Sequence, residues 1–334
     1  MQTRTLGKDL TVSAVGYGCM GLSHAYGRAV DDAEAVKTIR AAFDAGYTFF
    51  DTAEIYGSED DPHVNERLVG EALKDVRGRV QIASKFGIRF DLSNSQGPHP
   101  LIPDARPETI RRSVEGSLER LQTDHIDLYF QHRIDPKVAP EEVAEVMAAL
   151  INEGKILHWG ISEANEDYLR RAHAVCPVTA VENRYSMMAR HYEALFPVLE
   201  ELGVGLVAFS PMANGLLTGR YGKGEHFDAT YDYRAAMPQF TDEAMDENRA
   251  LFALLDDLSA RKQATPAQIS MAWMLCKKPW IVPIPGSRHV DRIRENAGAA
   301  EVSLTADEVL AIDEALSGME MSAVYGGVAV KERI

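Results

Sequence analysis

The sequence lacks the features that mark several large classes of protein. It holds only three cysteines, an odd number at wide spacing, so we expect neither a disulfide framework nor a cysteine-based zinc site. No apolar run approaches the roughly 18 residues of a membrane-spanning helix. The first residues, Met1–Leu6, lack the apolar core of a secretion signal. We therefore expect a soluble, cytoplasmic protein.

Basic residues are also scarce. The chain of 334 residues has 35 Lys and Arg against 50 Asp and Glu, which gives a formal net charge of −15. Such an acidic chain is not expected to bind nucleic acid or an anionic membrane, so the expected partner is a small molecule. The oligomeric state stays open.

The histidines lack metal-binding spacing. Neither His-x-His nor His-Glu-x-x-His occurs in the sequence, so we expect no metal site. Most of them are expected on the surface or in loops: His24, His63, His99, His125, His173 and His226.

Short apolar runs typical of buried strands alternate with helical patterns along the whole chain. Strands are expected near residue 15 and at 49–51, 80–85, 126–131, 156–161, 180–183, 204–209 and 281–283. Helices are expected at 31–45, 64–73, 107–121, 141–151, 166–174, 192–202, 243–262, 266–276, 290–296 and 305–316. Eight βα units in a chain of this length predict an α/β protein with a (β/α)8 TIM barrel, an N-terminal β-hairpin at 4–12 and extra helices. No linker-like stretch interrupts it, so we expect residues 1–334 to form a single domain.

A glycine run near the start admits two interpretations. Gly16, Gly18 and Gly21 have the G-x-G-x-x-G spacing of a dinucleotide-binding turn. That motif opens directly into a helix, whereas residues 22–27 intervene here. A glycine-rich turn that closes the first barrel strand is therefore the favoured interpretation, with a Rossmann domain as the alternative.

Three expected strands each deliver an ionisable residue. Asp51, Lys85 and His132 lie at the ends of successive strands, and Tyr56 follows Asp51 by five residues. Because parallel strands end at one edge of a sheet, we expect these four side chains to meet. A lysine beside a tyrosine lowers the pKa of the phenol, and an aspartate keeps that lysine charged and oriented. The set suits protonation of a carbonyl oxygen, with His132 hydrogen-bonded to the same oxygen.

Other chemistries at this edge remain as alternatives. Lys85 as a Schiff-base lysine would make an aldolase, but that role needs a depressed lysine pKa rather than a neighbouring aspartate. Metal-assisted hydrolysis has less support, because the metal spacings are absent. A second cluster, the basic segment 283–296 after the last expected strand, predicts an anion or phosphate site. The long segments 86–106 and 211–240 leave the same end of the sheet and are candidate covers.

The quoted residues resemble the aldo-keto reductase family over nearly the whole chain. The segments that carry the resemblance are 50–57 (Phe-Asp-Thr-Ala-Glu-Ile-Tyr-Gly), 65–70 (Asn-Glu-Arg-Leu-Val-Gly), 84–85 (Ser-Lys) and 127–132 (Asp-Leu-Tyr-Phe-Gln-His). Residues 129–136 further resemble the branch that includes perakine reductase and other small-aldehyde reductases. The resemblance implies NADPH-dependent, reversible reduction of aldehydes or ketones. Tyr56 would be the general acid, Lys85 and Asp51 its tuning pair, and His132 the group that orients the carbonyl.

The resemblance also implies where NADPH or NADP⁺ binds without a Rossmann domain. The nicotinamide end would be held by Gly18, Cys19, Met20, Asp51, Ser162, Glu182 and Phe209. The pyrophosphate would follow Ser210, Pro211, Asn214, Gly215, Leu216 and Thr218. The 2′-phosphate and adenine would meet Gly286, Ser287, Arg288, Arg292, Glu295 and Asn296. The substrate would be selected by Met20, Tyr26, Phe86, Phe90, Phe130 and Arg133 together with the two long segments.

Three positions differ from the commoner pattern of that family. Phe209 stands where tyrosine is frequent, Glu163 where asparagine is frequent and Glu182 where glutamine is usual. An ionised carboxylate at position 182 can accept from an amide but cannot donate to it. The resemblance also leaves a second class open: an NADP(H)-binding regulatory or redox-sensing module like the potassium-channel β subunits.

Overall fold

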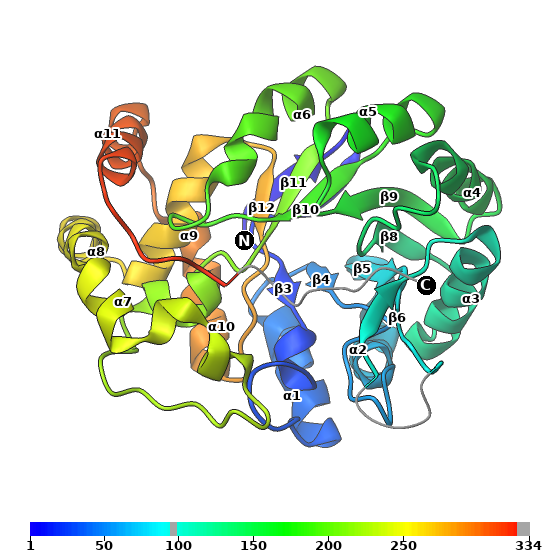
Figure 1. Cartoon of the computed structure of the whole chain (residues 1–334), viewed down its shortest axis with the longest axis horizontal. Coiled ribbons are helices and arrows are strands. Elements are labelled where there is room, and N and C mark those ends of the chain that lie inside the picture. Colours follow the sequence, from blue (N-terminus) through cyan, green and yellow to red (C-terminus); the bar gives the residue numbers. More distant parts are fainter. Residues whose placement is uncertain (94–98, 326–334) are drawn as a thin grey trace.

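The computed structural model describes residues 1–93 and 99–325, and eight parallel strands form the centre of the fold (Figure 1). In spatial order they are β12 (Ile281–Pro283), β11 (Gly205–Phe209), β10 (Ala180–Arg184), β9 (Ile156–Ser162), β8 (Ile126–Gln131), β5 (Gln81–Phe86), β4 (Phe49–Asp51) and β3 (Tyr17–Gly18). The two edge segments also meet, because the Gly16 and Gly18 amides donate to the carbonyls of Pro283 and Pro285 over 2.9 and 3.1 Å. The sheet therefore closes into the predicted (β/α)8 barrel.

Helices surround these strands (Figure 1). They are α1 (Asp32–Asp44), α2 (Val64–Leu73), α3 (Pro107–Leu121), α4 (Pro140–Asn152), α5 (Glu166–Val175), α6 (Phe196–Leu202), α7 (Asp242–Glu247), α8 (Arg249–Lys262), α9 (Pro266–Lys277), α10 (Val290–Ala297) and α11 (Ala306–Ser317). Local chemistry fixes their starts: Asp31 caps α1, proline opens α3, α4 and α9, and Thr305 makes a capping box on α11. No helix in the described ranges is long and apolar enough to cross a bilayer.

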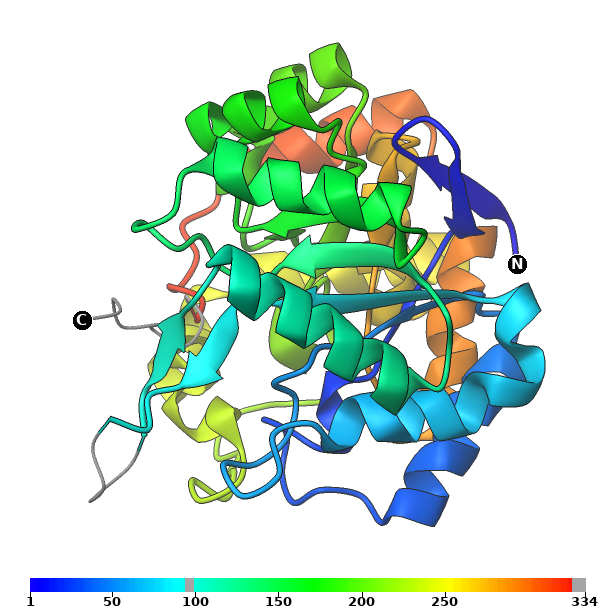
Figure 2. The same cartoon turned by 90° about the vertical axis from the view of Figure 1, so that its right-hand side faces the viewer.

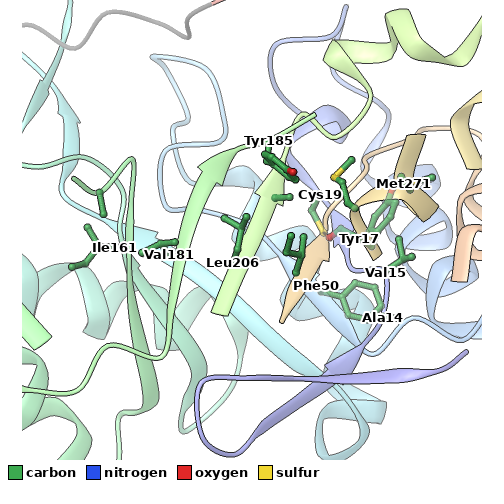
Figure 3. Packing of buried hydrophobic residues seen from close by; sticks show 14 of the residues in the cluster. Ala14, Val15, Tyr17, Cys19, Phe50, Ile161, Val181, Tyr185, Leu206 and Met271 are labelled. Carbon is green, nitrogen blue, oxygen red and sulfur yellow. Dashed lines mark hydrogen bonds between the residues drawn. The ribbon is translucent and has the colours of Figure 1, made fainter. Parts of the chain in front are cut away.

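Alternation along each strand separates two layers of packing. Phe50, Ile161, Val181 and Leu206 point outward into the large cluster beneath the helices (Figure 3). Their strand neighbours, such as Phe49, belong to a smaller cluster inside the barrel. Since side chains alternate with a period of two, the residues that end the strands on the inward face gather at one mouth of the barrel.

An antiparallel hairpin fills the opposite end. β1 (Thr3–Leu6) pairs with β2 (Leu10–Ser13), as the alternation at 4–12 predicts. Leu6, Leu10 and Val12 belong to the inner cluster, so the hairpin closes the N-terminal end of the barrel. Figure 2 shows this hairpin on the side of the molecule away from a second one, β6 (Ile88–Phe90) with β7 (Leu101–Pro103).

Four segments differ from the sequence-based expectation. The segment 86–106, expected as a loop, contains the hairpin β6–β7. The helix expected at 192–202 begins as a 3-10 turn, His191–Leu195, and becomes α-helical at Phe196. The helix expected at 243–262 is two helices that meet at Asn248, whose fully buried side chain bonds to Ser322. The segment 211–240 contains short 3-10 turns, which the sequence pattern did not indicate.

Candidate active site

The four predicted side chains meet at the mouth of the barrel. Asp51 ends β4, Lys85 lies on β5, His132 follows β8 by one residue, and Tyr56 lies in the loop after β4. Asp51 lies two residues after Phe49 on β4, and Lys85 lies two residues after Ala83 on β5. Phe49 and Ala83 belong to the inner cluster, so Asp51 and Lys85 also face inward. All four are at least nine-tenths buried. These strand ends therefore converge, as the sequence predicts.

Lys85 is the centre of the group. Its Nζ donates to both carboxylate oxygens of Asp51 over 2.7 and 2.6 Å and to the Thr52 carbonyl over 3.0 Å. The same nitrogen is 3.3 Å from Oε1 of Glu182 on β10. It also lies 5.1 Å from the centroid of the Tyr56 ring. The ammonium therefore has two carboxyl partners and faces the phenol.

Burial and mutual charge set the protonation of this group. Burial raises the pKa of Asp51, although the Lys85 ammonium opposes the rise. Burial and the neighbouring Asp51 charge raise the pKa of Glu182 to about 8. Burial lowers the pKa of Lys85, but Asp51 and Glu182 more than offset it and the pKa lies above its ordinary value. At neutral pH the group is therefore close to electrically neutral, with Lys85 and Asp51 charged and Glu182 protonated.

The pKa of Tyr56 differs from the expected direction. Burial raises it, and the Lys85 ammonium lowers it without overcoming that effect. The main reason is burial, and the charges of Asp51 and Glu182 add to the rise. The pKa of His132 lies well below its ordinary value because of burial and then the nearby Arg133. His132 is therefore a neutral imidazole at physiological pH, and its ring meets the Tyr56 ring edge to face at 5.6 Å.

His24, expected to be a surface or loop residue, contacts Tyr56. Its ring stacks on the Tyr56 ring at 6.3 Å, and its Nδ1 is 2.9 Å from the Gly57 carbonyl. The hydroxyl of Ser23 donates to the Tyr56 carbonyl over 2.6 Å. The loop that carries Tyr56 is therefore held by the segment after β3. Nothing in the sequence pattern indicated this, because the contact joins residues more than thirty positions apart.

The predicted nicotinamide-side residues occupy neighbouring strand ends. Ser162 and Glu182 are paired in register on β9 and β10, and Phe209 ends β11 on the inward face. Oε2 of Glu182 is buried and has no hydrogen-bond partner in the described part of the chain. Cys19 is fully buried in the large cluster, which leaves only its backbone facing the neighbouring strands.

Two glycines of the predicted cofactor set and the turn after β11 have closely packed backbone. A Cβ added at Gly18 would lie 2.8 Å from the Ile284 carbonyl oxygen, and one at Gly286 would lie 2.8 Å from that of Gly18. After β11 the chain turns through positive φ at Ser210, Asn214 and Gly215. The rest of that set, Pro211, Leu216 and Thr218, belongs to the same turn.

The predicted adenine-side residues lie between β12 and α10. Arg288 donates to the carbonyls of Gly21, Gly27 and Arg28, and so ties this segment to the loop after β3. Arg220 pairs with Glu295 over 2.6 Å. Among the other residues predicted to contact the adenine and the 2′-phosphate, Ser287 and Arg292 are half-buried and Asn296 is buried.

The residues predicted to contact substrate separate into two groups. Met20 and Phe90 pack with Tyr56 in a small cluster at the mouth, and Tyr26 bonds through its hydroxyl to Asn214 over 2.7 Å. Phe86 and Phe130 are instead fully buried, which corrects the prediction that they line the substrate chamber. Phe86 points outward from β5 and packs on Tyr129, and Phe130 packs inside the barrel against Gly160. Arg133 is half-buried and bonds to Ser162 over 3.2 Å.

A parallel-stranded barrel with ionisable groups at the carboxyl ends of its strands is the architecture of a barrel enzyme. The model of the aldo/keto reductase family matches residues 14–317, so the chain belongs to that family. Its members are oxidoreductases that act on carbonyl groups with nicotinamide cofactors.

Individual relatives agree with this assignment. A probable aldo-keto reductase of Glycine max is 39% identical over 307 residues, which cover 91% of this chain and 86% of the relative. The holo form of an aldo-keto reductase of Bacillus halodurans superposes with a TM-score of 0.77 at 28% identity and covers 98% of both chains. The glycerol dehydrogenase of Gluconobacter oxydans superposes with a TM-score of 0.85 at 26% identity, covering 98% of this chain and 99% of that one.

Proposed function

We propose that this protein is an NADPH-dependent reductase of aldehydes or ketones in which Tyr56 is the general acid. The observation that carries the proposal is the position of Lys85, which is bonded to Asp51 and faces the Tyr56 ring at 5.1 Å. A buried phenol with a raised pKa keeps its proton until a stronger base forms next to it. A carbonyl oxygen becomes such a base as negative charge develops on it.

The residues around the mouth fit a nicotinamide dinucleotide. The unpaired Oε2 of Glu182 offers a buried polar atom to a carboxamide, and Glu182 in its protonated form can donate as well as accept. Gly18 and Gly286 let two backbone segments approach closely beside the mouth, because a Cβ at either would lie 2.8 Å from a carbonyl oxygen. Arg292 makes no ion pair within the described residues and would be available for the 2′-phosphate of NADPH.

When bound, the nicotinamide supplies a hydride to the carbonyl carbon. The protein side of the reaction then has three parts. Tyr56 gives its proton to the carbonyl oxygen, and Lys85 stabilises the resulting phenolate. His132, which is neutral because burial lowers its pKa, donates an N–H to the same oxygen and fixes its position. The reverse oxidation follows the same path.

The choice of small aldehydes as first substrates comes from residues 129–136, which resemble the perakine reductase branch. The test is consumption of NADPH, followed by its near-ultraviolet absorbance, with a panel of aromatic and aliphatic aldehydes. We expect turnover by the native protein and a loss of at least about 100-fold in kcat for Tyr56→Phe, because general acid catalysis contributes that much or more. NADPH affinity of the variant should stay within about twofold.

Two outcomes would contradict the proposal. Turnover that survives in Tyr56→Phe would remove the general-acid role. Tight NADPH binding with no turnover of any aldehyde would favour the regulatory or redox-sensing module. Tyr168→Phe is a matched control, since this phenol on α5 is also buried but bonds to Gln131 rather than facing the Asp51–Lys85 group.

A further inference from the structure

Two arginines without carboxylate partners lie beside the proposed reaction centre. Arg133 follows His132 at the end of β8, and Arg184 ends β10, on the same face of the strand as Glu182. β9, with Ser162 at its end, lies between them in the sheet (Figure 1). Within the described residues, neither guanidinium has a carboxylate oxygen within the 4.0 Å of an ion pair.

The unpaired state of Arg184 is unusual for its burial. The residue is only 8% exposed, and buried arginines are nearly always paired. Its guanidinium carbon lies 5.5 Å from the centroid of the Phe209 ring, and the described residues give this head group no hydrogen bond or ion pair. Oε1 of Glu163 accepts from the backbone amide of Arg184 over 3.4 Å rather than from its side chain.

Arg133 extends this positive region to the catalytic group. Its Nη1 donates to the His132 carbonyl over 2.7 Å and to the Ser162 hydroxyl over 3.2 Å. Its charge helps to lower the pKa of His132. Burial and the Glu163 carboxylate raise the pKa of the Tyr192 phenol, and Arg184 and Arg133 both oppose the rise, so both guanidinium groups act on this phenol. The two arginines outnumber the one carboxylate there. In a chain with a net charge of −15, this local excess of positive charge points to an anionic ligand.

We propose that Arg133 and Arg184 bind a carboxylate on the substrate, so that the preferred substrates are aldehydes or ketones that carry an acid group. This inference rests on the proposed reductase function and names its substrate class. A carboxylate matches the planar fork of a guanidinium and would supply the missing partner of Arg184. Placed near Ser162, it would hold the carbonyl end of the same molecule towards His132 and Tyr56.

The test compares aldehydes that carry a carboxylate with neutral aldehydes of similar size. We would measure kcat/KM for para-formylbenzoate and for methyl para-formylbenzoate, and for succinic semialdehyde against butanal. The native protein should prefer the acids, and Arg184→Gln and Arg133→Gln should each lower the acid-to-ester ratio by about 10- to 100-fold, as expected for a lost charge-assisted hydrogen bond. Arg184→Lys should restore part of the ratio. The matched control is Arg79→Gln, since Arg79 also rests over a ring, Phe43 at 4.7 Å, away from the mouth.

A binding measurement without turnover separates this inference from the proposed function. Calorimetric titration with benzoate, in the apo protein and with NADP⁺, should give an affinity that Arg184→Gln weakens by a similar factor while circular dichroism stays unchanged. If none of these four aldehydes is reduced, the aldehyde panel decides the reductase proposal and benzoate binding alone decides whether the anion site exists.

Three results would overturn the inference. One is an acid-to-ester ratio near one in the native protein. Another is a ratio that Arg184→Gln leaves unchanged. The third is a loss of NADPH affinity in Arg184→Gln without any change in the ratio, which would assign this guanidinium to a cofactor phosphate.

Discussion

Oε1 of Glu182 lies 3.3 Å from Nζ of Lys85, so the ammonium that Asp51 holds has a second carboxyl partner. Two carboxylates beside one cation would leave the buried group with a net negative charge. The rise in the pKa of Glu182 to about 8 prevents this at neutral pH. The glutamate thus behaves at physiological pH like a neutral hydrogen-bonding side chain, and its contribution to stability falls as pH rises from its ordinary pKa of 4.5 to the folded pKa of about 8.

The first prediction concerns Glu182→Gln and pH. A carboxyl whose pKa is raised on folding stabilises the folded state at low pH and loses that contribution as pH rises through the folded pKa of about 8. The free energy of unfolding of the native protein should therefore fall between about pH 5 and pH 8.5 by on the order of a few kcal/mol more than that of Glu182→Gln. Urea unfolding at a series of pH values measures this difference. The exposed Glu119→Gln is the control, and parallel curves for native protein and Glu182→Gln would refute the prediction.

The second prediction concerns the choice between NADPH and NADH. Arg292 is half-buried on α10, and no carboxylate in the described ranges pairs with it. Arg292→Gln should raise the dissociation constant for NADPH by about 10- to 100-fold and leave that for NADH nearly unchanged, because only NADPH carries the 2′-phosphate. Fluorescence titration with both cofactors tests this. Arg294→Gln, two residues away and exposed, should change neither constant. An equal effect of Arg292→Gln on both cofactors would mean that its role is structural.

The third prediction concerns the segment after α11. Asn248 is fully buried and makes two bonds to Ser322, from its Nδ2 to the hydroxyl over 2.8 Å and from the Ser322 amide to its Oδ1 over 3.0 Å. Asn248→Ala should lower the free energy of unfolding by about 1–3 kcal/mol. It should also speed proteolysis of the segment 319–325. Ser322→Ala, which keeps the backbone bond, should have a smaller effect. Unchanged proteolysis in Asn248→Ala would show that other contacts hold the segment.

The fourth prediction concerns the packing inside the barrel. A Cβ at Gly160 would lie 2.3 Å from the Phe130 ring and 2.5 Å from the Ala180 carbonyl oxygen. Gly160→Ala should therefore destabilise the protein by about 1–3 kcal/mol or more, since a backbone atom cannot move aside cheaply. Thermal unfolding monitored by circular dichroism measures the loss. Gly78→Ala, where nothing lies within 4 Å, should be close to neutral. A stable Gly160→Ala protein would mean that β9 and β10 can shift apart.

The sequence alone was sufficient for the eight barrel strands and for the prediction that four ionisable side chains meet at one mouth of the barrel. Alternation of apolar runs and helical patterns is a local property, and it predicted the eight barrel strands together with caps such as Asp31 and Thr305. Asp51, Lys85 and His132 could be found because each ends a strand, and parallel strands must end at one edge. The break between α7 and α8 at Asn248 was missed, because the side chain of this residue bonds to a partner more than seventy residues away.

Tertiary structure decided the electrical state of the site and the role of each aromatic. Phe86 and Phe90 are alike in the sequence, yet one packs outward beneath the helices and the other lies beside Tyr56. Likewise, the pKa of Tyr56 depends on how far Asp51 and Glu182 neutralise Lys85, and the unpaired Arg184 is visible only once its neighbours are in place. Burial and pairing depend on contacts between distant segments, whereas strand and helix periodicity is set by neighbours in the chain.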